Sequence, residues 1–389
     1  MVKYRLGDIC EIVSGSTPKT GVSEYWDGDK KWITPAEITD ESYIITDSVR
    51  KLTELGVAKT GLSSFPKGTV ILSSRAPIGK VAIAGCEMYC NQGFKNLICS
   101  QKIYNRYLYW FLKGNTEYLN SLGRGATFKE ISKQIVASIE INVPDMEQQM
   151  QAAENLERVS SIIRLRKQEL QKLDDLIKAR FVELFGNPIS NPMKWDTYQL
   201  EECLERIDNG KSFICSDKPR VGDAPAILKL SAATYGDYRP NENKALLDES
   251  LFVESAEVHA GDLLFTRKNT PELVGTAAYV QNTPSKLMMP DLIFRLVPNE
   301  KVNAVFLWQL INCKEFRPVI QAISGGSAKS MSNISKERLG KIKVICPPRE
   351  LQDSLIPFVE QTDKSKAAIQ KALDEAQLLF DSLMQKYFG

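Results

Sequence analysis

An internal duplication constrains this chain more than any other feature of its 389 residues. Residues 138–144 (Ser-Ile-Glu-Ile-Asn-Val-Pro) and 341–347 (Lys-Ile-Lys-Val-Ile-Cys-Pro) are similar and both end in a proline, and these prolines lie 203 positions apart (347 − 144). Residues 131–133 (Ile-Ser-Lys) recur at the same separation as residues 334–336, and no gap is needed across this stretch. Single residues that match in the same register are Glu147 with Glu350, Gln149 with Gln352, and Gly186 with Gly389. A repeat of this kind predicts one fold built twice.

The earlier part of each half matches more loosely. Three pairs of segments remain similar: residues 4–6 with 198–200, the turns at 14–16 and 208–210, and residues 68–72 with 261–265. The matched segments predict a common scaffold, and the diverged segments between them predict surfaces with different tasks. Drift after the duplication is the alternative explanation for the divergence.

Composition narrows the class of protein. A hydrophobic share of 43%, with no apolar run near the roughly 20 residues that span a bilayer, is typical of two or three globular domains and no membrane span. The polar start at Met1–Arg5 predicts no signal peptide. Eight cysteines without a Cys-x-x-Cys pair predict reduced thiols and a cytoplasmic protein. The net charge of +2 neither requires nor excludes nucleic acid, because local charge steers binding.

Each half ends in a predicted long helix, at residues 144–186 and 347–389. The first carries a heptad at Leu156, Ile163, Leu170, Ile177 and Leu184, with Val159 and Leu173 at the companion position, which Arg166 and Arg180 interrupt. The second carries Leu373, Phe380 and Tyr387 in one register and Ile369, Ala376 and Leu383 in the other, with weaker first turns at Thr362 and Lys366. Sustained heptads indicate a coiled coil, in which each helix is the natural partner of the other. A helix packed on its own globular domain is the alternative.

The remaining parts, residues 1–143 and 187–346, are predicted to be mixed α/β domains. Short apolar runs between turn signals predict strands at 69–72, 81–84, 96–98, 262–266, 276–280 and 292–297. Amphipathic helices are expected at 104–113 and 303–312, with Trp110 and Trp308 in their cores. Asn187-Pro188 and Asn191-Pro192 end the first long helix and form a hinge. The predicted class is therefore α+β, with two mixed α/β domains that are each followed by a long helix.

Several catalytic signatures are missing from the sequence. An adenine methyltransferase needs a glycine-rich loop for its methyl donor and an Asn/Asp-Pro-Pro-aromatic clamp, and neither occurs. A phosphate-binding Gly-x-x-x-x-Gly-Lys-Ser/Thr loop is also missing, and no acid-x-Lys triplet follows Pro290-Asp291. The single histidine, His259, is expected in a turn before a strand, and it makes a zinc site or a catalytic histidine improbable. We therefore expect recognition rather than catalysis.

Polar and basic side chains gather in corresponding loops of both halves. The loops are residues 73–80, 91–96 and 123–129 in the first half, and in the second half 266–270, at the place of the first loop, and 324–330, at the place of the third. Arg and Lys suit guanine edges, Asn and Gln suit adenine, and Ser, Thr and Lys suit phosphates. The predicted DNA contacts are Ser74, Arg75, Lys80, Asn91, Gln92, Lys95, Arg124, Thr127, Lys129, Lys211, Thr266, Arg267, Lys268, Asn269, Ser327, Lys329 and Ser330.

With these residues in view, the whole chain resembles the specificity subunit of a type I restriction-modification system. The resemblance rests on the duplication, on residues 68–80 (Gly-Thr-Val-Ile-Leu-Ser-Ser-Arg-Ala-Pro-Ile-Gly-Lys), on residues 91–95 (Asn-Gln-Gly-Phe-Lys), and on the strand-to-proline joints at 141–144 and 344–347. It implies two target-recognition domains, 1–143 and 187–346, which read the halves of a split double-stranded DNA target. It also implies that the spacer helices pair as an antiparallel coiled coil.

The resemblance further implies partners and cofactors. Two methyltransferase subunits would dock on the chain, and a motor-nuclease subunit is left open. S-adenosylmethionine, ATP and magnesium would belong to those partners, so this chain itself would hold no cofactor or metal. The second half has Met288-Met289-Pro290-Asp291 where the first has Asn-Gln-Gly-Phe, which predicts an asymmetric target. A two-domain scaffold for protein partners and an enzyme with an unrecognised site are the rival hypotheses.

Overall fold

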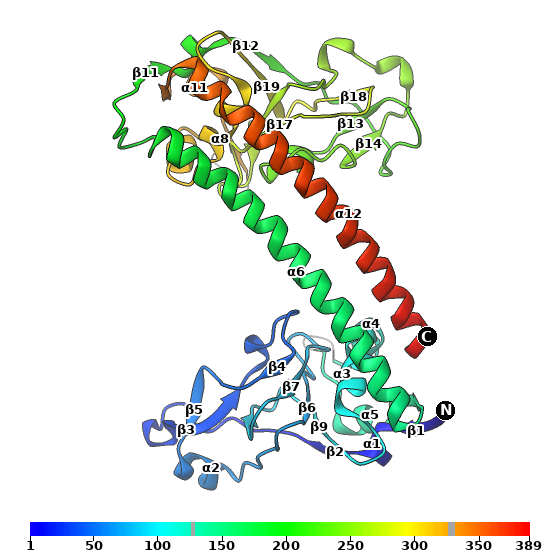
Figure 1. Cartoon of the computed structure of the whole chain (residues 1–389). Coiled ribbons are helices and arrows are strands. Elements are labelled where there is room, and N and C mark those ends of the chain that lie inside the picture. The colour runs from blue at the N-terminus through cyan, green and yellow to red at the C-terminus, as the bar shows by residue number, and fades with distance from the viewer. Residues whose placement is uncertain (126–128, 326–330) are drawn as a thin grey trace. The chain divides into compact units, whose positions relative to one another are not determined.

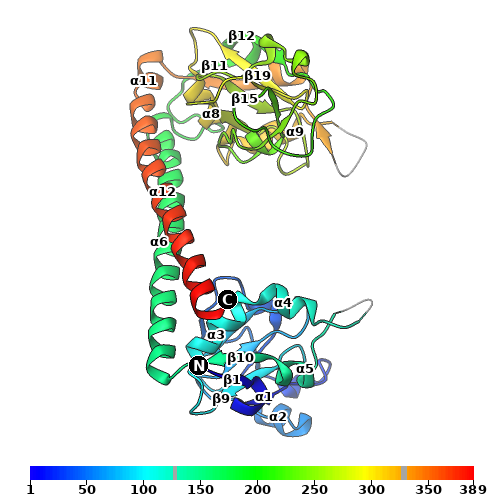
Figure 2. The same cartoon turned by 90° about the vertical axis from the view of Figure 1, so that its right-hand side faces the viewer.

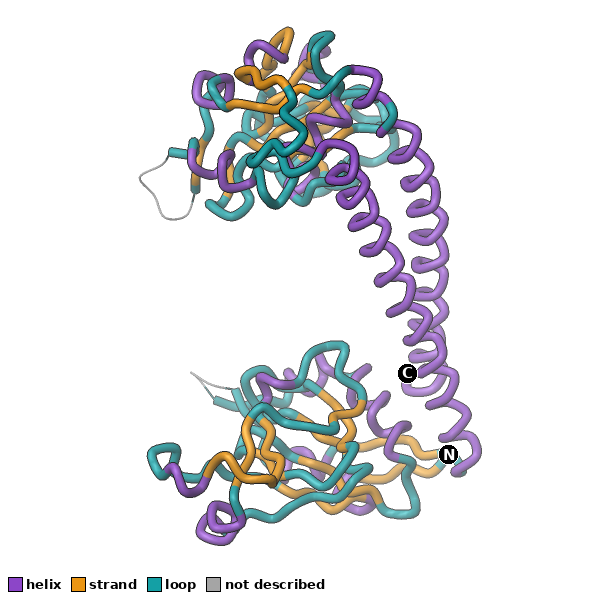
Figure 3. Tube along the Cα trace, turned by 60° about the vertical axis from the view of Figure 1, so that its left-hand side comes forward, coloured by secondary structure: helices purple, strands orange, loops and turns teal. Residues whose placement is uncertain are grey.

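The computed structural model describes residues 1–125, 129–325 and 331–389. It divides the chain into two compact units: unit 1 is Met1–Lys167 with Lys371–Gly389, and unit 2 is Gln168–Gln370. Each unit therefore contains one globular part together with a stretch of each long helix. Figure 3 shows that short strands, short helices and loops make up the globular parts, whereas the long helices are uninterrupted over most of their length.

Unit 1 begins with a strand and continues through short strands and short helices until the first long helix (Figure 1). Its strands are β1 Val2–Arg5, β2 Cys10–Val13, β3 Trp26–Ile33, β4 Ile44–Ile45, β5 Arg50–Leu52, β6 Val70–Leu72, β7 Val81–Ala84, β8 Tyr89–Cys90, β9 Asn96–Cys99 and β10 Glu140–Val143. Its helices are α1 Leu6–Ile9, α2 Glu54–Thr60, α3 Asn105–Gly114, α4 Thr116–Ser121, α5 Lys133–Ser138 and the start of α6 Met146–Phe185.

Unit 2 follows the same plan. Its strands are β11 Asp196–Gln199, β12 Leu204–Asn209, β13 Ala226–Leu228, β14 Asn243–Ala245, β15 Leu263–Thr266, β16 Lys268–Asn269, β17 Ala277–Tyr279, β18 Leu287–Met288, β19 Ile293–Pro298, β20 Ser332–Asn333 and β21 Lys343–Cys346. Its helices are α7 Ser231–Thr234, α8 Ala304–Asn312, α9 Arg317–Ala322, α10 Lys336–Gly340, α11 Arg349–Asp353 and the start of α12 Leu355–Phe388.

The strand order repeats between the units. The main sheet of unit 1 runs β2-β9-β6-β7-β4, and that of unit 2 runs β12-β19-β15-β17. A second sheet has the order β5-β3-β8 in unit 1 and β14-β13-β18 in unit 2. The first and last strands of each globular part also pair with each other, β1 with β10 and β11 with β21. The duplication that the sequence shows over its later segments therefore extends to these three sheets, whereas, within the described residues, the edge strand β4 belongs to unit 1 alone and the pair β16-β20 to unit 2 alone.

A glycine precedes an inner strand of the main sheet in each unit, Gly68 before β6 and Gly261 before β15. Gly68 has φ 89° and Gly261 has φ 94°, a left-handed conformation that glycine adopts without the steric cost of a Cβ. In each unit this turn closes onto the neighbouring strand: Gly68 N donates to Ala84 O at 2.8 Å, and Gly261 N donates to Val280 O at 2.7 Å. The weak sequence match at residues 68–72 and 261–265 thus marks the same turn-to-strand joint.

A buried glutamine joins each long helix to its globular part. Gln149 Oε1 accepts from Tyr104 N at 2.7 Å, and Gln352 Oε1 accepts from Asn303 N at 3.0 Å. Each glutamine also donates to the carbonyl of the proline that precedes its helix, at 2.9 Å and 2.8 Å. Because a buried amide costs free energy unless it is hydrogen-bonded, the two glutamines fix the same joint in both units.

The six strands and two amphipathic helices expected from the sequence are present, with ends within one residue of the prediction. They are β6, β7, β9, β15, β17 and β19 and the helices α3 and α8. Trp110 lies in the core of unit 1 at 3% exposure, as expected. Trp308 is only partly covered, because its Nε1 donates to Gly236 O at 2.7 Å at the edge of the core of unit 2.

The end of α12 packs on α3 in unit 1 (Figure 2). The rings of Trp110 and Phe380 lie 5.6 Å apart edge to face, and those of Tyr107 and Phe388 lie 4.9 Å apart. Next to these contacts, Asn155 Nδ2 of α6 donates to Tyr387 Oη at 3.0 Å. Aromatic pairs at these distances add about 0.5–1.5 kcal/mol beyond their buried area. The end of the second long helix is therefore part of the core of unit 1.

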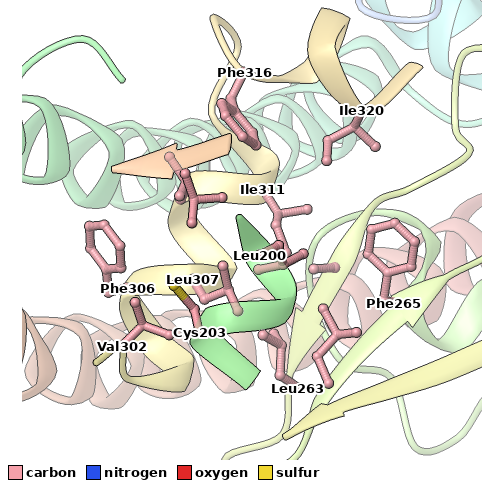
Figure 4. Packing of buried hydrophobic residues seen from close by; sticks show 14 of the residues in the cluster. Leu200, Cys203, Leu263, Phe265, Val302, Phe306, Leu307, Ile311, Phe316 and Ile320 are labelled. Atoms are coloured by element: carbon pink, nitrogen blue, oxygen red, sulfur yellow. The ribbon is translucent and has the colours of Figure 1, made fainter. Parts of the chain in front are cut away.

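The end of α6 packs in the same way into unit 2. The rings of Phe181 and Phe185 lie 5.7 Å and 4.9 Å from the ring of Phe306 on α8. Figure 4 shows Phe306 and Leu307 of α8 beside Leu200 and Cys203, in a cluster that continues to Phe265 of β15.

The predicted second long helix differs from the structure at its start. The chain forms a short α11 and then α12, with a break at Ser354. Pro357 explains the break, since it has no N–H to donate to the carbonyl of Asp353 and its ring would crowd that carbonyl. Proline is tolerated in the first turn of a helix, and α12 begins at Leu355 accordingly.

The predicted heptad positions are covered in both helices. Leu156 and Ile177 are buried, and none of the other predicted seam residues is exposed. The exposed apolar residues of the helices lie at other positions, and they include Ile162, Leu165, Leu176, Val182, Leu378 and Leu379.

Candidate nucleic-acid interface

The turn between β6 and β7 in unit 1 is shaped by its own side chains. Ser73 Oγ donates to Pro77 O at 2.7 Å and accepts from Lys80 N at 2.8 Å, which closes the loop on itself. Lys80 Nζ donates to Pro35 O at 3.1 Å, so this amine lies between the turn and a second loop. The turn carries Ser74 and Arg75 at its start.

Three loops that are distant in the sequence meet at Ser74. Its N–H donates to Gly93 O at 2.7 Å, and its carbonyl accepts from Ile131 N at 3.0 Å. These bonds bring residues 91–95 and the segment around residue 130 onto the turn of residues 73–80. The first and second predicted loops therefore form one surface with the base of the third.

A nearly buried cation holds this junction together. Lys95 is 7% exposed, and its Nζ lies 3.2 Å from Ser74 Oγ and 3.2 Å from Glu130 Oε1. Arg75 Nη1 lies 3.8 Å from the other oxygen of Glu130, and its side chain is about one third exposed. Burial gives Lys95 and Ser74 a structural task, and Arg75 remains the member of this group that can contact DNA.

The other predicted residues of unit 1 are arranged around this group. Asn91 Oδ1 accepts from Gly93 N at 2.9 Å, which shapes the loop, and the exposed Gln92 Oε1 accepts from Thr17 Oγ1 at 2.6 Å. Arg124 and Lys129 are exposed, on either side of residues 126–128. Thr127 lies outside the described residues.

The equivalent junction in unit 2 centres on Arg267. Its N–H donates to Leu292 O at 3.0 Å, and its carbonyl accepts from Ile334 N at 2.8 Å, which repeats the bonding of Ser74. The guanidinium lies 4.8 Å above the ring of Phe294 and donates to Asn333 Oδ1 at 3.3 Å. Arg267 is therefore the backbone counterpart of Ser74, and its side chain is only partly exposed.

Two other predicted residues of unit 2 are buried. Thr266 Oγ1 lies 2.9 Å from Thr276 Oγ1, and Asn269 Nδ2 donates to Thr234 Oγ1 at 3.1 Å. Both side chains support the loop rather than extend from it.

The surface of the same loop carries Lys268, whose Nζ lies 3.9 Å from Asp291 Oδ2. Asp291 Oδ1 accepts from Ser212 Oγ at 2.6 Å, and the neighbouring Lys211 is exposed. Lys211 is thereby brought to the loop of Lys268. Ser327, Lys329 and Ser330 lie outside the described residues.

Unit 2 also contains a buried ion pair. Arg295 Nε lies 3.2 Å from Asp262 Oδ2, and both side chains are largely covered. Burial raises the pKa of Asp262, and the hydrogen bond from His259 N and the charge of Arg295 oppose that shift. His259 thus lies in a turn before β15, as expected, with an exposed ring whose Nε2 is 3.8 Å from Glu257 Oε2.

A search for metal ligands and membrane spans covers residues 1–125, 129–325 and 331–389. Within these ranges no three His, Cys, Asp or Glu side chains are grouped to hold a metal ion. No helix there is both long and apolar enough to cross a membrane.

A family model described as the type I restriction modification DNA specificity domain matches residues 1–175 and 192–377. The chain belongs to this family. The two matched segments correspond to the two copies of the duplicated fold, so the specificity domain occurs twice.

Curated relatives are type I restriction enzyme specificity subunits. The MjaIX subunit of Methanocaldococcus jannaschii is 39% identical over 230 residues, 54% of this chain and 52% of the relative. The EcoEI subunit of Escherichia coli is 31% identical over 202 residues, 50% of this chain and 34% of the relative. The EcoKI subunit of Escherichia coli K12 is 22% identical over 344 residues, covering 81% and 72%. The chain thus matches about half, or less, of the length of the first two relatives.

Solved structures agree on the fold. A type I restriction-modification S subunit from M. genitalium has a TM-score of 0.60 at 14% identity, covering all of this chain and 96% of that one. A chain from a structure of type I restriction-modification complex assembly has a TM-score of 0.55 at 17% identity, covering 99% and 97%. At these identities the likeness shows that this specificity-domain chain shares the two-domain fold with long helices.

Sequence reasoning missed several residues of this specificity-domain surface. Thr17, Glu130 and Asp291 were not among the predicted contacts, although each is hydrogen-bonded to one or lies in an ion pair with it. Ser212 was also missed, and it is hydrogen-bonded to Asp291. The matched turns at 14–16 and 208–210 could have pointed to Thr17 and Ser212, because each follows its turn by one or two residues. The sequence match also placed residues 288–291 opposite residues 91–94. The backbone pairing corrects this to residues 290–293.

Proposed function

We propose that this chain is the DNA-specificity subunit of a type I restriction-modification complex. Each globular part reads one half of a split, asymmetric double-stranded target. The observation that carries the proposal is that one framework, with the same backbone hydrogen bonds at Ser74 and at Arg267, presents different polar side chains in the two units. Arg75 and Gln92 belong to one surface, and Lys211, Lys268 and Asp291 belong to the other. Such a pair of surfaces suits two different half-sites.

The proposed contacts divide between phosphates and bases. The exposed Lys129, Arg124 and Lys211 present cationic groups that suit phosphate oxygens. Arg75 and Lys268 each lie in an ion pair with a carboxylate, which restricts the direction of the side chain. A restricted side chain suits a base edge, because hydrogen bonds to a base require a defined geometry.

The long helices are proposed to pair as an antiparallel coiled coil that sets the gap between the half-sites. Covered heptad positions support this proposal, as do two contacts between the helices. Asn155 donates to Tyr387 in unit 1, and Lys366 Nζ lies 2.6 Å from Asp174 Oδ1 in unit 2. Lengthening both helices by a matched helical segment is expected to widen the gap and to leave the half-site sequences unchanged. An altered half-site would contradict this role.

The same helices are proposed to dock two methyltransferase subunits, with a motor-nuclease subunit as a further candidate. Exposed apolar side chains on the helices support a docking surface, because soluble proteins rarely expose such residues in groups without a partner. S-adenosylmethionine, ATP and magnesium are assigned to those partners, since the sequence lacks the loops that hold a methyl donor or a nucleotide phosphate. The chain is proposed to be non-catalytic and cytoplasmic, and purified without partners it is expected not to methylate DNA.

Methylome sequencing of cells with and without the gene is the decisive test. The expected result is that one split adenine-methylation motif with unequal halves disappears on deletion and returns when the gene is supplied again. If every methylated motif survives deletion, the proposed function is wrong.

Binding to DNA at two salt concentrations separates this function from a scaffold for protein partners. Each lost phosphate contact is expected to reduce the slope of log affinity against log salt by about 0.9. Lys211→Gln should lower that slope, whereas Lys364→Gln, an exposed lysine of α12, serves as the matched control. Arg75→Ala and Arg267→Ala should weaken binding, and unchanged affinity in both variants would remove these residues from the interface.

A further inference from the structure

Backbone hydrogen bonds align one loop of unit 1 with one loop of unit 2, residue by residue. At the end of each loop, a loop carbonyl accepts a hydrogen bond from a residue that follows β6 in unit 1 or β15 in unit 2. Ser74 N donates to Gly93 O at 2.7 Å, and Arg267 N donates to Leu292 O at 3.0 Å. Gly93 and Leu292 are therefore equivalent positions.

A second pair of bonds fixes the start of the same two loops. Ser16 N donates to Cys90 O at 3.1 Å, and Lys211 N donates to Met289 O at 2.9 Å. Cys90 and Met289 are therefore equivalent as well. Two residues lie between Cys90 and Gly93, and two lie between Met289 and Leu292, so neither loop has an insertion relative to the other. The second of these residues is Gln92 in unit 1 and Asp291 in unit 2.

A hydroxyl group orients the side chain at this position in both units. Thr17 Oγ1 donates to Gln92 Oε1 at 2.6 Å, and Ser212 Oγ donates to Asp291 Oδ1 at 2.6 Å. Both Gln92 and Asp291 are exposed. An exposed polar side chain held in one direction by a neighbour is suited to present its remaining hydrogen-bonding groups to a ligand.

Glycine makes this arrangement possible in both units. A Cβ on Gly15 would lie 1.9 Å from Cys90 O, and a Cβ on Gly210 would lie 2.0 Å from Pro290 O. These distances are far below van der Waals contact, so only glycine lets the segment pass close enough to carry its hydroxyl to the loop. The same backbone device therefore supports a different side chain in each unit.

The two side chains differ in what they can bind. With Thr17 on one lone pair of Oε1, Gln92 keeps a second acceptor site and both amide N–H donors, which match the N6 donor and N7 acceptor of adenine. Asp291 only accepts, which matches the N4 amino group of cytosine. Lys268 Nζ lies 3.9 Å from Asp291 Oδ2, and its charge offsets the repulsion between this carboxylate and DNA phosphates.

We infer that Gln92 and Asp291 are corresponding base-reading residues, Gln92 for an adenine in one half-site and Asp291 for a cytosine in the other. Thr17 and Ser212 are positioning residues that act through them. The inference rests on the proposed function, and it adds the residue pair and the chemical class of base that make the two half-sites differ.

The test selects DNA from a random duplex library with the tagged full-length chain and the subunits that copurify with it. Wild type is expected to enrich a split motif. Gln92→Asp is expected to change one position of one half-site from adenine to cytosine, and Asp291→Gln to make the reverse change in the other half-site. A good base contact discriminates by about 5- to 150-fold, so each change is visible in the enriched sequences. Gln92→Ala and Asp291→Ala should leave the same positions degenerate.

The positioning residues have their own readout. Thr17→Ala should reduce discrimination at the position that Gln92 reads without changing the preferred base, and Thr17→Ser, which keeps the hydroxyl, should restore it. Ser212→Ala and Ser212→Thr should behave in the same way in the other half-site. If wild type enriches a split motif and all four Gln92 and Asp291 variants enrich the same motif, the inference is wrong and the proposed function stands. A wild-type chain that enriches no motif overturns both.

Discussion

Replacing Gly15 by alanine is the sharpest structural test of the proposed reading surface. The added Cβ would lie 1.9 Å from Cys90 O and 2.5 Å from Cys90 Sγ. A carbonyl oxygen cannot rotate away as a flexible side chain can, so the segment must retreat from the loop. The retreat breaks the bond from Ser16 N to Cys90 O and moves Thr17 Oγ1 away from Gln92.

The expected cost follows from these contacts. Overpacking costs about 1–3 kcal/mol, and the hydrogen bonds that are lost cost about 1 kcal/mol each. For a unit of this size, 1 kcal/mol lowers Tm by about 2–4 °C, so the combined loss of about 3–5 kcal/mol corresponds to roughly 6–20 °C. Gly21→Ala is the matched control, because nothing lies within 4 Å of its added Cβ and Gly21 is exposed. It should leave Tm unchanged or raise it slightly, since alanine restricts the unfolded chain.

Scanning calorimetry measures Tm, and DNA selection measures the half-site of unit 1. Gly15→Ala should lower Tm and weaken discrimination in that half-site, while the other half-site is unchanged. Gly210→Ala should do the same for unit 2, where the added Cβ would lie 2.0 Å from Pro290 O. If Gly15→Ala and Gly21→Ala melt at the same temperature and enrich the same motif, the close approach is not a feature of the folded protein.

Three further predictions concern the interior of unit 1. In urea, Glu130→Gln should lower the free energy of unfolding more than Lys95→Met does. Glu130→Gln leaves the buried Lys95 cation without its carboxylate, whereas Lys95→Met removes that cation. The opposite order would contradict the assigned pairing. Burial raises the pKa of the Cys90 thiol to about 12, so its thiolate is scarce below that pH. Iodoacetamide should therefore label Cys90 at pH 8 only after denaturation, and rapid labelling of the native protein would contradict its burial. Cys10 and Cys99 are directly opposite in β2 and β9, and they form a pair without mutual hydrogen bonds, where the two strands lie closest. Diamide should therefore link them by a disulfide, which peptide mass spectrometry would detect. Absence of the linked peptide would contradict the register.

The sequence was sufficient to predict the duplicated scaffold, because the scaffold follows from patterns that physics imposes locally. The alternation of polar and apolar residues in strands and the heptads of the long helices are periodic patterns, and a proline marks the start of each predicted long helix. The left-handed glycines at 68 and 261 and the buried Gln149 and Gln352 also leave single-residue traces at fixed separations. The break at Ser354 was not predicted, because residues 347–389 were expected to form one helix and Pro357, which marks the break, is a single residue without a periodic pattern.

The reading surface could be predicted only in part, because polar residue type does not reveal burial. Lys95, Ser74, Thr266 and Asn269 have the same chemistry as exposed DNA contacts, yet their side chains are buried and bonded within the loops. Their partners come from segments tens of residues away, such as Glu130 for Lys95. Sequence distance hides such pairs, and no local pattern marks them.

The alignment of the two units changes what the duplication means for specificity. Because the backbone is the same at both sites, a difference in target must come from the side chains that the backbone presents. Ser74 is replaced by Arg267 and Gln92 by Asp291, while the bonds that position these residues are unchanged. A duplicated reader can therefore acquire a second target through a few substitutions without disturbing the glycines, the glutamine joint or the core. Exchanging Gln92 and Asp291 tests this argument directly, since a shared framework should carry either side chain in either unit.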